Sequence, residues 1–252
     1  WGGGAGGTGG GARGDPWGGG LGGAGVGLAG EGWPVDRHGP MRLLGRFDLT
    51  GLDPLPGVLQ GVGYVVVWEP RGARETVGEA DGGGAGASRL LVRSYPGREG
   101  LVVLDEPAGG RRDSLSYEAS RGRWVEVESW PESGDPADHP SVVRPEGFEE
   151  GIDDWASSAG AFEDAPSGDH RVGGWPTLVQ GRLWWEAGPA SECLGGDAGF
   201  VRLRDSARPV FAMQIGEDGA SGVNFGDFGV LSLARGTAPG SESRWFYEIA
   251  YL

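Results

Sequence analysis

The apolar positions of this chain recur mostly with the two-residue period of β-strands. In the segment 41–49, Met41, Leu43 and Phe47 alternate with other residues, and the segment 58–68 ends in an apolar run typical of a buried strand. Six further segments meet the same criteria: 88–95, 100–104, 124–130, 210–215, 229–234 and 245–251. The pattern predicts a mainly β fold of the α+β class with few helices.

One segment, residues 147–162, has the period of an α-helix. Its apolar residues recur at spacings of three and four on one side: Phe148, Ile152, Trp155, Ala159 and Phe162. Four acids occupy the other side and the first turns, where the helix dipole favours negative charge: Glu149, Glu150, Asp153 and Asp154. Residues 105–122 and 131–145 are predicted to be loops.

The charge of the chain is negative and unevenly distributed. The net charge is −15, and residues 131–170 contain eleven acids and only Arg144 against them, a net of −10. Such a protein repels nucleic acid phosphates and anionic membrane surfaces, so neither is predicted as a partner. We expect the face with Glu149, Glu150, Asp153 and Asp154 to dock a basic protein, with a merely solvated surface as the alternative.

Composition excludes several other classes. All 21 basic residues are arginine, so a Walker A phosphate loop and a Schiff-base lysine are both impossible. No apolar run is long enough to cross a bilayer. Cys193 is the single cysteine, so no internal disulfide forms, which suits a reducing cytoplasm. The cytoplasm is therefore the predicted location.

The first 32 residues contain 18 glycines, and glycine loses the most backbone entropy on ordering. Residues 1–18 are therefore predicted to be a flexible tail, and residues 19–252 a single domain. Residues 20–25 match the G-x-G-x-x-G pattern of dinucleotide-binding turns, but no strand pattern precedes them. In so glycine-rich a segment we attribute the match to chance.

A faint internal repeat divides the domain into halves of about 19–105 and 165–252. The triplet 32–34, Gly-Trp-Pro, recurs at 174–176. Each triplet is followed by a strand with an acid at its end, Asp48 in the first half and Glu217 in the second, then by a glycine-containing turn and another strand. Two units predict a duplicated fold, since a solenoid needs three or more.

These motifs resemble the YwqG-like family, a bacterial family of unknown function. The segment 170–180 (HRVGGWPTLVQ) is similar to its G-G-x-P turn with a preceding His and a following Gln, and 212–218 and 225–230 resemble its next strand and turn. In the first half, 32–34, 44–49 and 55–59 take the corresponding places. The resemblance implies a mainly β, internally duplicated fold and no established activity.

Few residues stand out as candidates for chemistry. Of the three histidines, His170 opens the best motif and is a candidate for ligand contact, or alternatively for a hydrogen bond that fixes the turn. Asp227 lies in a Gly-Asp-Phe-Gly turn, and a functional interpretation joins it with Asp48 and Glu217 as an oxygen cluster. EF-hand spacing is absent, so no metal site is predicted. Neither H-E-x-x-H nor G-x-S-x-G occurs, and no catalytic residue or cofactor is assigned.

The chain is rich in tryptophan, with eleven in total. Trp33 and Trp175 stand in the paired Gly-Trp-Pro turns, and with Gln180 they complete the set of binding candidates. We predict a non-catalytic binding protein with an acidic docking face. The alternative is a carbohydrate-binding or carbohydrate-active protein, in which Trp33, Trp175, Trp184 and Trp185 would form an open platform beside two acids.

Overall fold

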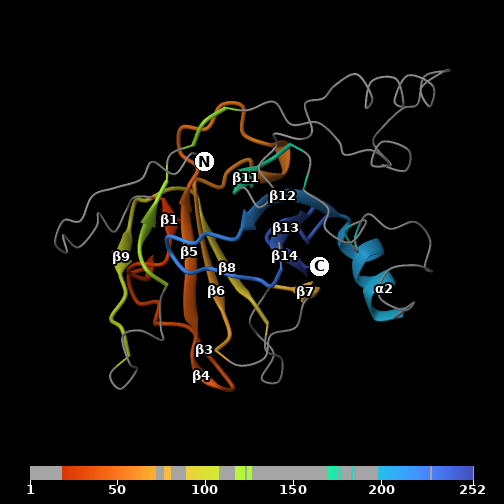
Figure 1. The fold of residues 1–252 in the computed structure, drawn as a ribbon. Coiled ribbons are helices and arrows are strands. Elements are labelled where there is room, and N and C mark those ends of the chain that lie inside the picture. The colour runs from red at the N-terminus through yellow and green to blue at the C-terminus, as the bar shows by residue number, and fades with distance from the viewer. Residues whose placement is uncertain are drawn as a thin grey trace, which may run out of the picture.

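The computed structural model describes residues 19–71, 77–80, 89–107, 117–122, 124–126, 170–174, 176, 183, 185, 198–227 and 229–251. Several predictions lie outside these residues: the tail 1–18, the acidic helix 147–162 with its four acids, Trp175, Gln180, Trp184 and Cys193. Over the described residues the fold is mainly β, as predicted, with antiparallel sheets and one short α-helix (Figure 1).

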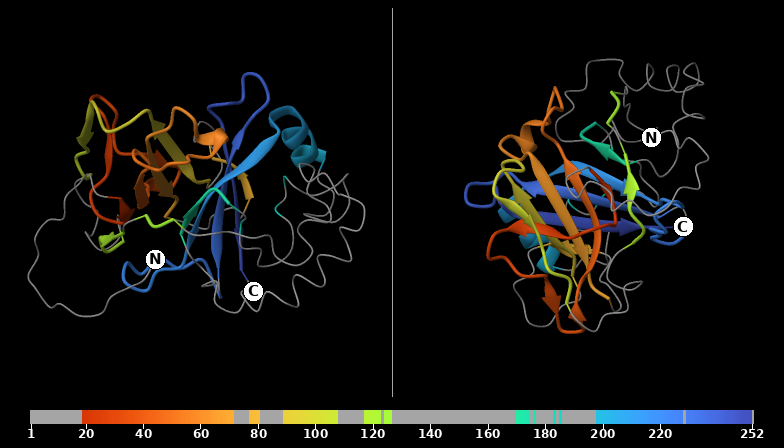
Figure 2. Two further views of the ribbon diagram at one scale, coloured as in Figure 1. Left: turned by 90° about the horizontal axis from the view of Figure 1, so that it is seen from above. Right: turned by 90° about the vertical axis from the view of Figure 1, so that its left-hand side faces the viewer.

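Two five-stranded antiparallel sheets form the body of the protein. The first sheet has the order β10 (Ser120–Arg121), β1 (Gly20–Leu21), β5 (Arg42–Asp48), β6 (Tyr64–Glu69) and β8 (Leu91–Tyr95). The second sheet has the order β11 (Arg171–Val172), β12 (Pro209–Gly216), β13 (Val230–Gly236), β14 (Trp245–Ala250) and β7 (Val77–Glu79). The view from above in Figure 2 shows the two sheets side by side as separate layers.

The remaining elements are short. Strands β2 (Val26–Leu28) and β9 (Leu101–Val103) form one two-stranded ribbon, and β3 (Val35–Asp36) and β4 (Gly39–Pro40) form another. A 3-10 turn, η1, covers Gly57–Leu59, and the helix α2 covers Ala198–Ala207. Among the described residues no helix has the length and apolar character that a membrane crossing requires.

The long strands lie where the apolar pattern predicted them. Strands β5, β6, β8, β9, β12, β13 and β14 each fall within or overlap a predicted segment. Two predictions differ from the structure. Residues 124–126, at the start of the predicted strand 124–130, are not in a strand, and Ser120–Arg121 forms β10 inside a predicted loop. Helix α2 was not predicted.

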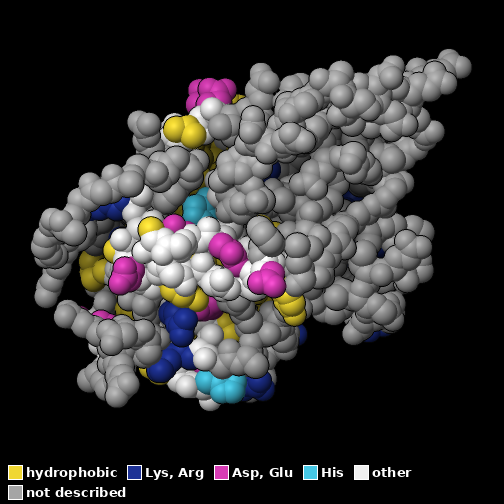
Figure 3. Space-filling view, viewed as in Figure 1, with side chains coloured by type: hydrophobic (Ala, Val, Ile, Leu, Met, Phe, Trp, Pro, Cys, Tyr) yellow, Lys and Arg dark blue, Asp and Glu magenta, His cyan; other side chains and the backbone are white. Residues whose placement is uncertain are grey.

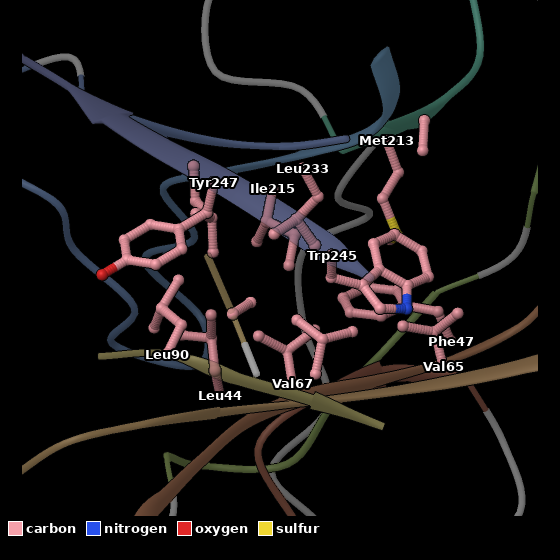
Figure 4. Packing of buried hydrophobic residues seen from close by; sticks show 14 of the residues in the cluster. Leu44, Phe47, Val65, Val67, Leu90, Met213, Ile215, Leu233, Trp245 and Tyr247 are labelled. Atoms are coloured by element: carbon pink, nitrogen blue, oxygen red, sulfur yellow. The ribbon is translucent and has the colours of Figure 1, made fainter. Parts of the chain in front are cut away.

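The main core fills the space between the two sheets. From the first sheet it takes Phe47, Val65 and Val67, and from the second sheet Ile215 and Leu233, all at most 3% exposed. Figure 4 shows these side chains pointing toward one another from opposite layers. Each large aliphatic or aromatic side chain buried in this way contributes roughly 1.5–3 kcal/mol, so the interface between the sheets dominates the stability of the fold.

The outer faces of the sheets are covered differently. On the first sheet a second apolar cluster includes Leu43, Val66 and Trp68 together with residues of the β2–β9 ribbon. On the second sheet a smaller cluster joins Phe211, Ala234 and Phe246 to Ala207 at the end of α2 and to Leu183 and Trp185. The main core is therefore shared, whereas each outer face has its own cover.

The two sheets are joined along one edge through Ala80, which follows β7. Its amide donates a hydrogen bond to Trp245 O of β14 (2.7 Å), and its carbonyl accepts one from Val92 N of β8 (3.2 Å). Another link joins the loop after β12 to the segment before β10, where Glu118 N donates to Ser221 O (3.1 Å). Among the described residues, backbone hydrogen bonds thus connect the layers at these two places besides the apolar core.

Four strands in each sheet share one pairing register. One cross-strand row of the first sheet runs through β1, β5, β6 and β8: Gly20, Arg46, Val66 and Arg93. The corresponding row of the second sheet runs through β11, β12, β13 and β14: Arg171, Gln214, Ser232 and Glu248. Two residues before the row, each sheet has a β-bulge, at Leu44 in β5 and at Ala212 in β12.

The turns that follow β1 and β11 match as well. Gly22 and Gly23 have φ angles of +61° and +84°, and Gly173 and Gly174 have φ angles of +68° and +70°. These values lie in the left-handed region that glycine tolerates best. We call two residues of different sheets register-equivalent when they lie on matching strands at the same distance along the chain from the two cross-strand rows.

Candidate functional site

Asp48, the last residue of β5, is bound by residues of the neighbouring loops. Its carboxylate accepts hydrogen bonds from Thr50 N (3.0 Å) and Thr50 Oγ1 (2.6 Å) and pairs with the Arg98 guanidinium. Partial burial disfavours the charged form, yet the bonds from Thr50 and Arg98 prevail and hold the pKa of Asp48 below its usual value. Its carbonyl accepts a hydrogen bond from Trp124 Nε1 (2.7 Å). The side chain therefore holds the loop after β5 in place.

His170 lies just before β11 and is buried, with 9% of its surface exposed. Its Nδ1 accepts a hydrogen bond from Gly216 N at the end of β12 (3.1 Å). Burial lowers the pKa of His170 to about 4, although the charge of Asp218 acts in the opposite direction. The imidazole is thus neutral at pH 7 and ties β11 to β12. The alternative to ligand contact was a hydrogen bond that fixes the turn, whereas this hydrogen bond joins the imidazole to the end of β12.

Glu217 and Asp227 lie in the loop between β12 and β13. Glu217 Oε1 accepts a hydrogen bond from Gly229 N (3.4 Å), and Asp227 is exposed. Among the described residues, no group of three or more His, Cys, Asp or Glu side chains is arranged to hold a metal ion. Asp48, Glu217 and Asp227 are thus not brought together as the oxygen cluster that the sequence suggested.

The shared register of the two sheets pairs residues differently from the predicted repeat. Counted from the bulges, Asp48 is register-equivalent to Gly216, and Glu217 lies one residue further on. The turn of Gly173 and Gly174 is register-equivalent to that of Gly22 and Gly23. The Gly-Trp-Pro triplet at 32–34 therefore has no part in the matching turns, although its letters recur at 174–176.

Both tryptophans of the predicted platform that the structure describes are packed against a sheet. Trp33 packs edge-on against Trp68, with ring centroids 4.8 Å apart, and its Nε1 donates to Met41 O (2.9 Å). Trp185 is 5% exposed and belongs to the cluster beside α2. The ring of Trp33 thus packs in the outer apolar cluster of the first sheet, and the ring of Trp185 packs in that of the second sheet.

A buried carboxylate at the end of β6 forms a polar cluster that sequence reasoning missed. Glu69 is 3% exposed, and its Oε1 accepts a hydrogen bond from Tyr117 Oη (2.6 Å) and lies 3.4 Å from Arg42 Nη1. The Arg42 guanidinium also lies over the Tyr117 ring, 5.0 Å from its centroid. Burial and the charge of Glu69 raise the pKa of Tyr117 to about 12. The cluster fixes the segment before β10 against the first sheet.

The outer face of the second sheet carries the other feature that was missed, the row of Arg171, Gln214, Ser232 and Glu248, which we call the polar row. Gln214 and Ser232 are 0% and 1% exposed, whereas Arg171 and Glu248 are half-buried. Ser232 Oγ has no hydrogen-bond partner among the described residues. A buried hydroxyl without a partner costs about 1–3 kcal/mol, so this serine is unfavourable for stability as the chain stands.

The polar row contrasts with the corresponding row of the first sheet. There Val66 takes the place of Ser232 and is fully buried in an apolar cluster. Arg46 donates to Ala24 O (2.5 Å), and Arg93 donates to Gly32 O (3.2 Å). The segment after the first glycine turn therefore supplies partners to the arginines of its sheet. Only the pairing register brings the four residues of the polar row together, so no local motif could have revealed it.

The surface of the described residues is mixed in charge. They include 17 acids and 14 arginines, a net of −3. Figure 3 shows acidic, basic and apolar side chains interspersed over the described part of one face. The excess of negative charge in the whole chain, −15, therefore comes mostly from residues outside the described ranges.

Comparison with known proteins adds no further constraint on this site. No protein-family model matches the chain, and the search of curated proteins finds no match. The resemblance to the YwqG-like family therefore stays a prediction.

Proposed function

We propose that this chain is a non-catalytic binding protein that docks a basic protein through the acidic segment 131–170. The observation that carries the proposal is the distribution of charge. That segment has a net charge of −10, whereas all the described residues together have a net charge of −3. A cluster of like charges repels itself, so the concentration in one segment carries a cost that a docking role would offset.

Docking of this kind would depend on long-range electrostatics. Complementary charge speeds the encounter of two proteins and suppresses wrong partners more than it raises final affinity. Exposed charges are screened beyond about 8 Å at physiological ionic strength, so association should slow steeply as salt is added.

The test compares two variants of equal net charge. In the first, Glu149, Glu150, Asp153 and Asp154 are changed to arginine. In the matched control, four exposed acids of the described body are changed to arginine instead: Glu99, Asp105, Glu106 and Glu126. The probe is an arginine-rich peptide, and its association rate with the full chain is measured across a salt series. We expect the first variant to lose both rate and salt dependence, and the control to keep most of each.

The two variants separate a docking face from bulk charge. If both slow association equally, the effect comes from net charge alone and the docking face does not exist. If neither changes the rate, the acidic segment has no role in the encounter and the proposed function fails.

We further propose that the fold is an internal duplication of the YwqG-like kind. The shared register of four strands, the bulges at Leu44 and Ala212, and the left-handed turns after β1 and β11 support the duplication. Register-equivalent residues also face the same core, as do Phe47 and Ile215. In this proposal the ancestral unit is a glycine turn followed by three antiparallel strands.

A further inference from the structure

The second sheet has an open edge at β11. This strand is the last of its sheet, and among the described residues no other strand pairs with its outer side (Figure 1). Gly173 N donates to Ala212 O of β12 (2.8 Å), and the hydrogen bonds of an antiparallel pair alternate along each strand. The N–H and C=O of the half-buried Val172 therefore point away from β12, toward the outer side.

The equivalent edge of the first sheet shows how such groups are used. There β1 pairs with β10, and flanking bonds run from Gly23 N to Tyr117 O and from Gly122 N to Gly19 O, both 3.3 Å. Gly23 is register-equivalent to Gly174, which is exposed and has the same left-handed conformation. No described residue accepts a hydrogen bond from Gly174 N. The second sheet thus lacks, over the described ranges, the strand that β10 supplies to the first.

We call the outward backbone groups of Val172 and Gly174 the β11 edge, and we propose that this edge binds an extended strand of a basic protein. The strand adds to the second sheet antiparallel to β11, as β10 does to β1. The inference rests on the proposed function, from which the charge of the partner follows. The acidic segment 131–170 ends directly before β11 in the sequence, so a strand on this edge lies close to its C-terminal end.

A second copy of this chain fits the edge less well. Each copy has a net charge of −15, and pairing through β11 would bring the ends of two acidic segments together. Like charges of this size repel, whereas a basic partner gains attraction from the same segment. The edge offers few hydrogen bonds, so the charge of the partner contributes both to the encounter and to the choice of partner.

The geometry of the edge also sets the side-chain pattern that fits. Directly opposed residues of an antiparallel pair have their side chains on the same face, and only every second residue points its N–H at the partner. Val172 packs against the main core, so the residue bonded to it should be apolar. The residue opposite Arg171 lies on the outer face, where a positive charge would be repelled. The basic residues therefore belong toward the ends of the added strand.

The probe is the peptide acetyl-Arg-Arg-Thr-Val-Thr-Arg-Arg-amide, titrated calorimetrically into the full chain. Two analogues of the same charge carry one N-methyl group each. In one the methyl group is on the valine, whose N–H would face β11, and in the other it is on the following threonine, whose N–H would point away. We expect the unmodified and threonine-methylated peptides to bind alike. The valine-methylated peptide should bind at least about tenfold more weakly, because it loses a hydrogen bond and its methyl group blocks the edge.

A substitution on the chain locates the site. Val172→Pro removes an N–H that faces outward and keeps the bonds to β12, because an edge strand tolerates proline at such a position. It should weaken binding of the unmodified peptide roughly tenfold. The matched control is Val103→Pro on β9, where Leu104 N donates to Gly25 O of the segment before β2 and Val103 N therefore points outward. Val103 is 46% exposed, and its replacement should leave the affinity unchanged.

Hydrogen exchange gives a second measurement that needs no variant. The amides of Val172 and Gly174 should exchange quickly in the free chain and several-fold more slowly when the unmodified peptide is bound. Slow exchange at both amides in the free chain would assign the edge to a second copy or to another segment of this chain, and would overturn the proposal. Sedimentation would tell these two occupants apart.

The remaining outcomes separate this proposal from the proposed function. Equal binding by the two methylated peptides would overturn the strand-addition proposal, while the acidic docking function would stand if charge reversal in the segment 131–170 still slowed association. Different binding by the two peptides, with no effect of charge reversal, would refute the docking function and with it the basic character of the partner. Absence of binding by the unmodified peptide would overturn the strand-addition proposal.

Discussion

Gly22 and Gly173 make the same hydrogen bond in different sheets. The amide of Gly22 donates to Leu44 O (2.9 Å), and the amide of Gly173 donates to Ala212 O (2.8 Å). Leu44 and Ala212 are the bulge residues of β5 and β12. A bulge leaves one residue outside the regular ladder, and in each sheet the glycine turn supplies the partner for its carbonyl. The turn and the bulge are therefore a single structural unit.

Replacing either glycine by alanine should destabilise the protein. A left-handed residue other than glycine costs about 1–2 kcal/mol. The added Cβ at Gly22 would also meet the carbonyl oxygen of Tyr117, whereas at Gly173 it would meet the ring of Pro56 at 2.5 Å. A ring atom can move more easily than a backbone oxygen. We expect Gly22→Ala to lose about 3 kcal/mol of unfolding free energy and Gly173→Ala about 2 kcal/mol, measured by urea denaturation.

Gly30→Ala is the control for these two variants. Gly30 also has a positive φ, +96°, but its added Cβ would meet nothing within 4 Å. It should show only the backbone cost of about 1–2 kcal/mol. Equal losses in all three variants would mean that the turns after β1 and β11 have no special packing.

The long strands could be predicted from the sequence because the apolar pattern that marks a strand lies within the strand itself. The segment that contains Val65, Val66 and Val67 is apolar on both faces of its strand, and it is buried on both faces in the structure. The strands β1 and β11 have two residues each, too few to show a period. Helix α2 has only ten residues, with Gly199 in its first turn, so it is too short and too weak in helix propensity to stand out in the pattern.

The shared pairing register of the two sheets leaves little trace in the local sequence. The Gly-Trp-Pro triplets match in letters, whereas the turns that match in structure, Leu21-Gly22-Gly23 and Val172-Gly173-Gly174, share only two glycines. The first of these turns lies in a segment so rich in glycine that any glycine pattern matches it by chance. Pairing register is a long-range property, and it also assembles Arg171 with Gln214 from separate segments of the chain.

Protonation of His170 should make the stability depend on pH between 6.5 and 4. The pKa of His170 is about 4 in the folded protein and about 6.5 in an unfolded chain. As pH falls through this window, the unfolded state takes up a proton that the folded state does not, so stability is lost. The loss from this residue should reach about 3 kcal/mol by pH 4, measured as unfolding free energy against pH.

His170→Asn provides the comparison, because the Asn amide oxygen can replace Nδ1 as acceptor for Gly216 N. The variant should be less stable at pH 7, but its stability should fall less between pH 6.5 and 4. Parallel pH profiles for the two proteins would show that His170 does not titrate abnormally. The carboxylates of Asp48 and Asp218, whose pKa values are lowered, contribute at lower pH to both proteins alike.

Tyr117 should be identifiable by its alkaline titration. Burial and Glu69 raise its pKa to about 12, so its ultraviolet tyrosinate signal should develop about two pH units above that of an ordinary tyrosine. Tyr117→Phe should remove this late phase and lose about 1.5–3 kcal/mol, because a buried carboxylate loses a hydrogen bond. The exposed Tyr251 is the control, and Tyr251→Phe should change neither the late phase nor the stability. A signal near pH 12 that survives Tyr117→Phe would refute the assignment. Burial and Glu31 raise the pKa of Tyr95 still further, so its own phase should remain at higher pH in both proteins.

Arg244 should hold β7, and with it the edge that joins the two sheets. Its Nε and Nη2 donate to the two carboxylate oxygens of Glu79 at 2.6 and 2.7 Å, and its guanidinium lies 5.3 Å from the centroid of Phe246. Lysine keeps the charge but loses the two-pronged geometry and the planar stacking. Arg244→Lys should therefore lose about 1 kcal/mol of unfolding free energy. It should also speed hydrogen exchange at the amide of Ala80, which follows β7 and bonds to β14.

The control is Arg204→Lys, beside the exposed Asp205, which should change neither quantity. Unchanged exchange at Ala80 in Arg244→Lys would mean that the backbone hydrogen bonds alone hold this edge.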